Sequence, residues 1–377
     1  MARLTTARIE EHFADLPDPR RREGMYPLVN IVVIALCAVI GGADDFVAIA
    51  RWAEVKKDWL AKFLDLSAGI PSHDRFNAIF RALQPAEFEK CLLSWITALH
   101  EITDGQVVAI DGKTLRRSFD AASGKSAIHL VSAWATASHI SLGQVVVDAK
   151  SNEITAIPKL LEILDISGCL VTIDAMGCQK EIAQQIVDQQ ADYVLAVKDN
   201  QPKLHAAIRD FFSEHLEDDL QSVSHRRHQT HDEKEHGRTD DRDYYLAKLP
   251  EDFPLAKQWP GLKAIGMAVR VTEHADGRAS DDVRYYITSR YTSGKRFAGA
   301  VRGHWGIENS LHWQLDVTFG EDQCRIRKGH ADANFSLLRR TSLSLLKNNH
   351  TRKIGVKNKR LNAAWDDAYL LEVLCGT

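Results

Sequence analysis

The 377-residue sequence is poor in cysteine: its six cysteines are scattered, and no two of them form a C-x-x-C pair. This argues against a cysteine-built zinc site and for a reducing compartment. The amino terminus, Met1–Thr6, turns polar without an apolar core region, so no secretory signal peptide is expected. The longest apolar run, Leu28–Ile40, falls short of the about 20 residues that span a bilayer. These absences predict a cytoplasmic protein without a membrane segment.

Two further absences concern ligands. The sequence has no G-x-x-x-x-G-K-[ST] motif, so no nucleotide cofactor is expected. Its net charge is −3, whereas non-specific affinity for DNA comes from positive charge. The average hides an asymmetry, because residues 321–360 contain eleven Lys and Arg against three acids. This basic segment is compatible with DNA binding and equally with a solvated helix face.

The periodicity of apolar residues divides the chain into regions. Residues 1–100 read as helices, including an apolar helix over 28–40 and a helix capped by Ser72. From residue 106 a meander of three strands is followed by alternating helices and strands, which predicts a mixed α/β sheet. The expected strands are 107–110, 129–138, 142–148, 170–173 and 193–197, and the expected helices are 157–164, 180–190 and 201–212.

The later part of the chain breaks this order. Residues 213–290 are expected to form a β-rich insertion. Within it, the polar stretch 224–243 contains His225, His228, His231 and His236, and it is expected to be a loop whose histidines are solvated. A helical pattern then resumes over 295–312, and a long helix is expected over 331–348.

Two of the predicted strands each end in an aspartate. Val107–Ile110 leads into Asp111-Gly112, and Leu170–Ile173 leads into Asp174. The Asp-Gly pair is also the strongest short signal for a hairpin turn, which is the alternative interpretation of Asp111. Many α/β active sites begin with a carboxylate at the carboxyl end of a strand. The second copy of the pattern therefore favours a metal site.

A third carboxylate lies in an aromatic-rich helical segment. His304, Glu308 and His312 are spaced four residues apart and would share one helix face, flanked by Trp305 and Trp313. A surface helix with a buried Trp stripe and a zinc site made by His304, Glu308 and His312 are the alternatives. Three carboxylates from two strands and a helix suit two Mg²⁺ ions better than zinc, because Mg²⁺ prefers hard oxygen ligands.

Taken together, several short motifs resemble one family over nearly the whole chain. They are Ala109–Arg116, Ile173–Gln179, Val197–Gln201, His236–Arg238 and His304–Trp313. The chain resembles the DDE transposases of bacterial insertion sequences, and more narrowly the H-repeat-associated transposases. The resemblance implies a ribonuclease H-like catalytic domain over 101–348 that carries the β-rich insertion at about 213–290. A helical amino-terminal domain over 1–100, a candidate for binding DNA ends, would precede it, and a basic tail over 349–377 would follow.

The resemblance also implies a chemistry. Asp111, Asp174 and Glu308 would be the catalytic, metal-binding carboxylates, with Mg²⁺ as cofactor and Mn²⁺ as a substitute. The reaction would be cleavage of double-stranded DNA at the element's ends and transfer of the 3′-hydroxyl into target DNA, with a homodimer in the DNA complex. The alternatives are a metal-dependent nuclease that does not join strands, a catalytically silent DNA-binding relative, and, more remotely, a zinc-dependent hydrolase.

Two features of the resemblance leave assignments open. Related transposases often place Tyr, Arg and Lys around the glutamate, where this sequence has Val301, His304 and Leu315. Asp316, Glu321 and Asp322 remain alternatives to Glu308 as the third carboxylate. The candidate DNA contacts are Lys113, Arg116, Arg117, Lys198, Arg302, His304, Trp305, Arg325, Arg327 and Lys328.

Overall fold

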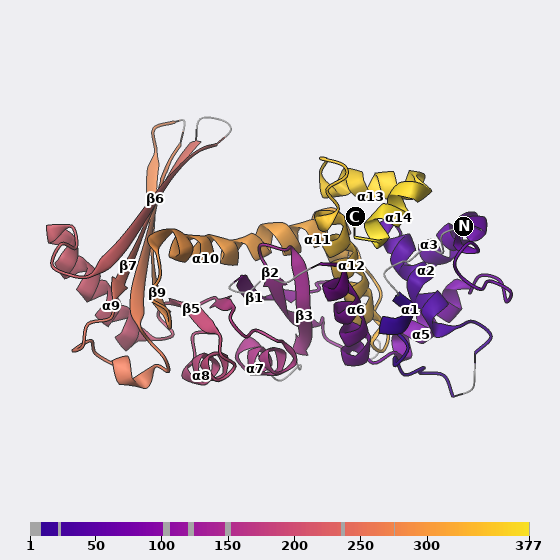
Figure 1. Ribbon diagram of the computed structural model, residues 1–377, viewed down its shortest axis with the longest axis horizontal. Helices are drawn as coiled ribbons and strands as arrows, with labels where there is room; N and C mark the ends of the chain where they lie inside the picture. Colours follow the sequence, from indigo (N-terminus) through magenta and orange to yellow (C-terminus); the bar gives the residue numbers. More distant parts are fainter. Residues whose placement is uncertain are drawn as a thin grey trace. The chain divides into compact units, whose positions relative to one another are not determined.

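A computed structural model describes residues 9–21, 24–100, 106–119, 124–147, 152–234, 238–274 and 276–376. The chain divides into two compact units (elements labelled in Figure 1). Unit 1 contains residues 1–102, 112–150 and 308–377, and unit 2 contains residues 103–111 and 151–307. The chain therefore passes from unit 2 to unit 1 directly after Asp111, within strand β1, and again directly before Glu308. Within the described ranges, the longest apolar helices are too short or too polar to cross a membrane.

Unit 2 is built on a mixed sheet. Strands β1, β4 and β5 are parallel neighbours, and β5 pairs on its other side with the antiparallel strand β9. Strands β9, β8, β7 and β6 then follow as an antiparallel series. The bounds are β1 Val107–Thr114, β4 Leu170–Ile173, β5 Asp192–Val197, β6 His225–Lys234, β7 Arg238–Lys248, β8 Ala264–Glu273 and β9 Ala279–Thr288. The prediction of a mixed α/β sheet is confirmed.

The helices of unit 2 connect these strands. Helix α8 joins the parallel strands β4 and β5, as the alternating sequence pattern predicted. The bounds are α7 Glu153–Ile163, α8 Lys180–Asp188, α9 Pro202–His215 and α10 Gly294–Ile307, with short 3₁₀ turns η1 Leu216–Asp218 and η3 Ala256–Gln258. Helix α10 leads the chain to Glu308.

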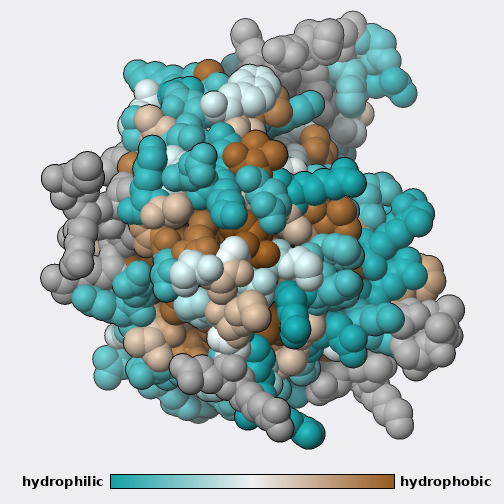
Figure 2. Space-filling view, turned by 90° about the vertical axis from the view of Figure 1, so that its right-hand side faces the viewer, coloured by the Kyte–Doolittle hydropathy of each residue, from teal (hydrophilic) through white to brown (hydrophobic). Residues whose placement is uncertain are grey.

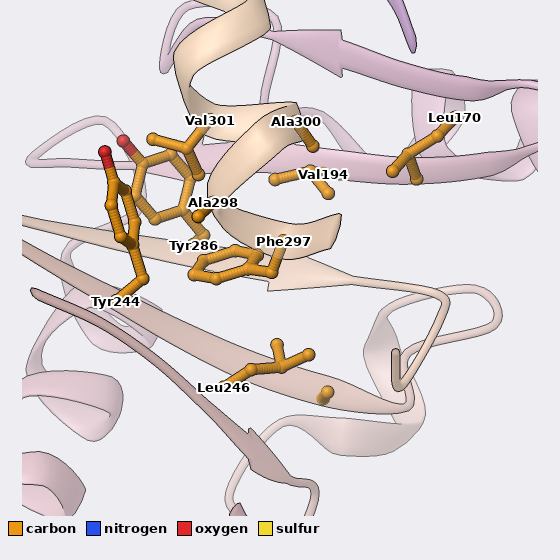
Figure 3. Packing of buried hydrophobic residues seen from close by; sticks show 10 residues of the cluster. Leu170, Val194, Tyr244, Leu246, Tyr286, Phe297, Ala298, Ala300 and Val301 are labelled. Carbon is orange, nitrogen blue, oxygen red and sulfur yellow. The ribbon is translucent and has the colours of Figure 1, made fainter. Parts of the chain in front are cut away.

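One buried cluster fixes α10 on the sheet. Figure 3 shows Phe297, Ala298 and Val301 of α10 directed toward residues of the strands, among them Val194 and Tyr286. The rings of Phe297 and Tyr286 meet edge to face with their centroids 5.7 Å apart. Strand β8 has Gly266 beneath Phe297, and a Cβ atom at that position would lie 2.4 Å from the ring. The missing side chain of Gly266 makes the space that the phenylalanine fills.

The prediction that residues 224–243 form a loop is wrong, because most of this stretch is strand. Strand β6 pairs along its whole length with β7, from His225 opposite Ala247 to Lys234 opposite Arg238. The side chains of β6 do not alternate between apolar and polar. Several of them instead form ion pairs with charged side chains of β7, beside the backbone hydrogen bonds that join the two strands. Arg227 pairs with Asp243, and Arg242 lies 2.6 Å from Asp232. His225, His228 and His231 are strand residues, while His236 lies outside the described residues.

Unit 1 contains two groups of helices and a β-hairpin. Strands β2 His129–Ala135 and β3 Ile140–Val147 are antiparallel, and the Leu115 N–H, just after β1, donates to the Ile128 carbonyl. The amino-terminal helices are α1 Ile9–His12, α2 Leu28–Ile40, α3 Phe46–Val55, α4 Lys57–Leu60, α5 His73–Ala82 and α6 Pro85–Leu99. The later elements are η4 Glu308–His312, α11 Trp313–Val317, η5 Glu321–Gln323, α12 Ala331–Asn348, α13 Val356–Trp365 and α14 Asp367–Leu374.

Helix α12 is the core of unit 1, since residues 331–346 are all buried. The amino-terminal helices supply part of its cover: Asn334 Nδ2 donates to the Phe80 and Leu83 carbonyls at 2.8 Å each. Residues 349–377, expected to be a basic tail, contain α13 and α14, and Arg360 is buried with Asp44 as its ion-pair partner. Figure 2 shows a face of the molecule on which hydrophilic side chains predominate and hydrophobic ones surface in limited areas.

Candidate active site

Asp111 and Asp174 come from neighbouring parallel strands. Strands β1 and β4 pair in register, with Ile110 opposite Ile173. Each aspartate is the next residue after this pair, so their backbones are separated by about one interstrand spacing, about 4.8 Å. Equal register in parallel strands directs the paired side chains of Ile110 and Ile173 to the same face of the sheet. Strand β1 continues through Asp111 and Gly112 to Thr114, so this Asp-Gly pair is not a hairpin turn.

The loop after β4 holds Asp174 in place. The Gly177 N–H donates to Asp174 Oδ1 at 3.2 Å. A side chain at Gly177 would collide with Ile173, because its Cβ would lie 2.2 Å from an Ile173 methyl carbon. Two residues that follow β5 bind the same loop: Asn200 Nδ2 donates to the Ala175 carbonyl at 2.5 Å, and Gln201 Nε2 to the Cys178 carbonyl at 3.0 Å. The motifs Ile173–Gln179 and Val197–Gln201 are therefore one structural assembly.

Asn200 and Gln201 are positioning residues that sequence reasoning did not assign. The signal was their place directly after β5, the next parallel strand beyond β4. Because the carboxyl ends of parallel strands meet at one edge of a sheet, residues that follow β5 can reach the loop that follows β4. Sequence alone does not show that their amides bond to the backbone of that loop.

Glu308 begins a π-helical segment, Glu308–His312, that directly follows α10. The continuous α-helix expected over 295–312 is thus interrupted, and π-helical turns occur frequently at functional sites. The Glu308 side chain is 55% exposed, and its Oε2 lies 3.7 Å from Nδ1 of the buried His312. Burial lowers the pKa of His312 and outweighs the hydrogen bond with Glu308, which acts to raise it.

Each of the three alternative carboxylates lies beside a basic side chain, although Arg116, the partner of Asp322, is 81% exposed. Lys113 forms an ion pair with Asp316, and its Nζ lies 3.2 Å from Glu321 Oε2. Glu321 is fully buried. Burial acts to raise its pKa, but Arg340 and Lys113 outweigh that effect, so the pKa of Glu321 is lowered. Arg116 Nε lies 3.4 Å from Asp322 Oδ2. A carboxylate held in this way is less suited to bind a metal than the half-exposed Glu308.

The candidate DNA contacts fall into different environments. Lys113 is buried, so the predicted phosphate contact does not fit its placement. The other candidates are at least partly exposed. Those of unit 1 lie in two short segments, residues 116–117 and 325–328. Arg327 Nε donates a hydrogen bond to the Arg117 carbonyl at 3.0 Å and so joins the two segments. Those of unit 1 are Arg116, Arg117, Arg325, Arg327 and Lys328, and those of unit 2 are Lys198, Arg302, His304 and Trp305.

The candidates on α10 contact the β-rich segment. Arg302 Nη2 lies 3.3 Å from Asp232 of β6. The Arg284 guanidinium of β9 stacks on the Trp305 ring at 4.1 Å, while Trp305 keeps 46% of its surface exposed. An exposed aromatic ring beside a guanidinium is a surface suited to nucleic acid, which is recognised by stacking and by phosphate contacts.

Comparison with known proteins identifies the family of the chain. A family model described as Transposase DDE domain matches residues 102–345, which is more than half of the chain. The chain belongs to the DDE transposase family. A second family model, DDE_Tnp_1-associated, matches residues 10–96 of the transposase. The family generally uses a divalent metal, and membership implies DNA binding and suggests a DNA-cleaving enzyme.

Relatives of this DDE transposase align over nearly its full length. "Putative transposase YncI" of Escherichia coli O157:H7 is 41% identical over 368 residues, covering 97% of this chain and 93% of the relative. "H repeat-associated putative transposase YhhI" of Escherichia coli strain K12 is 38% identical over 377 residues, covering 98% of each chain. The resemblance to H-repeat-associated transposases is confirmed. A shorter relative is named "Inactive transposase YbfQ" and is 34% identical over 68 residues, 18% of this chain and 81% of the relative.

Proposed function

We propose that this transposase cuts double-stranded DNA at the ends of its mobile element and joins the released 3′-hydroxyl to target DNA. Asp111, Asp174 and Glu308 would be the metal-binding carboxylates of a ribonuclease H-like catalytic domain. The observation that supports the proposal is the parallel pairing of β1 and β4, whose register ends at Ile110 and Ile173, one residue before Asp111 and Asp174. Carboxylates that follow the paired segments of two neighbouring parallel strands are a donor set of hard oxygens, which fits Mg²⁺ or Mn²⁺.

Glu308 is chosen as the third carboxylate because the other three candidate carboxylates of unit 1 are less suited to bind a metal. Asp316, Glu321 and Asp322 are each paired with Lys113 or Arg116, whereas the Glu308 side chain is half-exposed. When bound, the divalent ions would supply a nucleophile from water and neutralise charge on the phosphate. The protein's own contribution is to hold the carboxylates at fixed separation and to align the DNA strand.

The DNA would be held by exposed basic and aromatic side chains. We assign phosphate contacts to Arg116, Arg117, Arg325, Arg327 and Lys328 of unit 1, and to Lys198 and Arg302 of unit 2. His304 and Trp305 of α10 would contact the same strand. The helices of residues 1–100 would recognise the element's ends, and a homodimer would act in the DNA complex in the cytoplasm.

The test is cleavage of a supercoiled plasmid that carries the element's ends, in Mg²⁺, Mn²⁺ or EDTA. Asp111→Asn, Asp174→Asn and Glu308→Gln should each lower the nicking rate at least about 100-fold, because each removes a charged ligand. Asp210→Asn is the matched control, since Asp210 is a 67% exposed aspartate of α9 in an ion pair with Arg209. It should leave the rate unchanged.

Three outcomes would replace the proposal. Nicking at the ends without joined products would identify a nuclease. Binding of the ends without cleavage under any metal would identify a DNA-binding relative. If Glu308→Gln alone kept its activity, the third carboxylate would be Asp316, Glu321 or Asp322 in spite of their ion pairs.

A further inference from the structure

Lys113 occupies a position that the resemblance to transposases does not explain. It lies two residues after Asp111 in the same strand, and its side chain is only 9% exposed. Its Nζ is bonded to Asp316 of α11 and lies 3.2 Å from Glu321 of η5. It also donates to the His312 carbonyl at 3.4 Å. One ammonium group thus contacts three successive elements of the segment that begins at Glu308.

The charges around Lys113 compensate each other in a buried site. Glu321 is fully buried and accepts a hydrogen bond from Ser336 Oγ at 2.9 Å on α12. Arg340 of the same helix is also buried and acts on Glu321 electrostatically. A buried ion pair is strongly destabilised when one partner is removed, because an uncompensated charge stays behind. Lys113 is therefore bound to its present partners and is not available to a DNA phosphate.

The bond to the His312 carbonyl has a specific consequence. His312 is the last residue of the π-helical segment, and Glu308 is its first. The π-helical segment continues without a break into α11, which begins at Trp313. Lys113 therefore bonds to the residue at which the π turn passes into the α-helix, while Asp316 and Glu321 bind the same ammonium group from the elements that follow.

We propose that Lys113 is a positioning residue that fastens the Glu308 segment to the strand that carries Asp111. This proposal rests on the proposed function, in which Asp111 and Glu308 bind the same metal ions. Removing the ammonium group lets the π-helical segment shift, and a displacement of about 1 Å in a reacting group can cost about 100-fold in rate. The variant should still bind DNA ends normally, because Lys113 does not contact DNA.

The test compares Lys113→Met with Lys359→Met. Lys359 is a matched control because it is 7% exposed and lies in the same unit, where its Nζ donates to the Leu346 and Asn349 carbonyls at 2.9 and 2.5 Å. Both variants lose a buried ammonium group, but Lys359 does not belong to the Glu308 segment. If Lys113→Met does not fold, Lys113→Gln replaces it, because the amide keeps an N–H donor for the His312 carbonyl.

Four measurements are made on each full-length variant: thermal unfolding, affinity for DNA ends, nicking rate against Mn²⁺ concentration, and Mn²⁺ binding. Binding of Mn²⁺ to the free protein is followed by electron paramagnetic resonance, with Glu308→Gln as reference. Lys113→Met should nick about 10- to 100-fold more slowly and require more Mn²⁺ for half its maximal rate. It should bind DNA ends as the wild type does. Lys359→Met should lose thermal stability but keep the wild-type rate and Mn²⁺ requirement.

Several results would overturn the assignment. A wild-type nicking rate in Lys113→Met would do so, as would equal losses of rate in Lys113→Met and Lys359→Met. If Lys113→Met binds DNA more weakly, and the slope of its affinity against salt concentration falls by the amount expected for about one phosphate contact, Lys113 is a DNA contact instead. If the wild type does not cut, the proposed function fails separately. Lys113 then keeps its role only if Lys113→Met and Glu308→Gln both weaken Mn²⁺ binding and Lys359→Met does not.

Discussion

Replacing Gly266 by alanine should destabilise unit 2 because the new methyl group meets the Phe297 ring. The added Cβ would lie 2.4 Å from Phe297 Cζ and 2.8 Å from Cε2, whereas ordinary contact begins at 3.4 Å. The ring would have to move by about 1 Å. It is 1% exposed and packed edge to face against Tyr286, so it has no free space to enter. The displacement therefore has to be taken up by α10 or by β8.

The expected magnitude follows from what is known of overpacked cores. Forcing one extra carbon into a filled core costs about 1–3 kcal/mol. For a unit of this size that corresponds to a fall of roughly 2–12 °C in the midpoint of thermal unfolding. Because α10 leads directly to Glu308, a shift of the helix should also lower the rate of DNA cleavage.

Urea and thermal unfolding of Gly266→Ala would measure the effect, with Gly299→Ala as control. Gly299 is on the exposed side of α10 with open space around its Cβ position. Alanine there should stabilise the helix by about 0.5–1 kcal/mol, so the same substitution has opposite signs at the two sites. Phe297→Leu should relieve the collision, and the double variant should be more stable than additivity predicts by about 0.5–3 kcal/mol. Additive effects, or an unchanged midpoint in Gly266→Ala, would refute the reasoning.

Two further predictions concern carboxylates that are partly buried, Glu89, or buried, Asp240. Loss of solvation raises the pKa of Glu89 to about 8, although the Gln144 N–H that it accepts acts to lower it. In the unfolded state Glu89 releases its proton near the ordinary glutamate pKa of 4.5, whereas the folded state retains the proton up to about pH 8. The free energy of unfolding should therefore fall as pH rises from about 4.5 to 8, by at most about 1.4 kcal/mol per pH unit. Thermal midpoints measured across this pH range should decline in the wild type but not in Glu89→Gln. If the midpoints of the two proteins decline in parallel, the prediction is contradicted. Asp240 is 1% exposed and accepts from Arg270 Nη2 at 2.8 Å, so Asp240→Asn should cost about 3–5 kcal/mol in urea unfolding. The exposed control Asp282→Asn should cost less than about 1 kcal/mol, and equal losses would show that burial of the pair is not the cause.

Patterns that are local in sequence predicted much of the fold. The apolar run Leu28–Ile40 is helix α2 with the predicted bounds, and Leu170–Ile173 is strand β4. Ser72 caps α5 by accepting a hydrogen bond from the Arg75 N–H. These predictions succeeded because an apolar period or a capping side chain acts on the residues beside it. The apolar segments before Asp111 and Asp174 were predicted in the same way, although β1 does not end there but continues through Asp111 to Thr114.

Strand β6 was missed because its stability depends on residues far along the chain. Its residues are charged or polar, so no apolar alternation indicated a strand. Pairing with β7 satisfies its backbone, and Asp243 compensates the charge of Arg227. A polar stretch and a polar strand look alike in sequence, and only the partner strand distinguishes them.

The sequence by itself determined the family, the mixed sheet and the apolar strand segments that precede Asp111 and Asp174. Tertiary structure alone decided which charges are exposed and which are buried in pairs. Lys113 was expected to contact DNA, and Asp316 and Glu321 were alternatives to Glu308, yet the three side chains form one cluster in which Lys113 and Glu321 are buried. The physical reason is that the state of a charge depends on its solvation and its partners, and these come from elements about 200 residues apart. That separation is why sequence assigned Lys113 to DNA while the structure places it beneath the Glu308 segment.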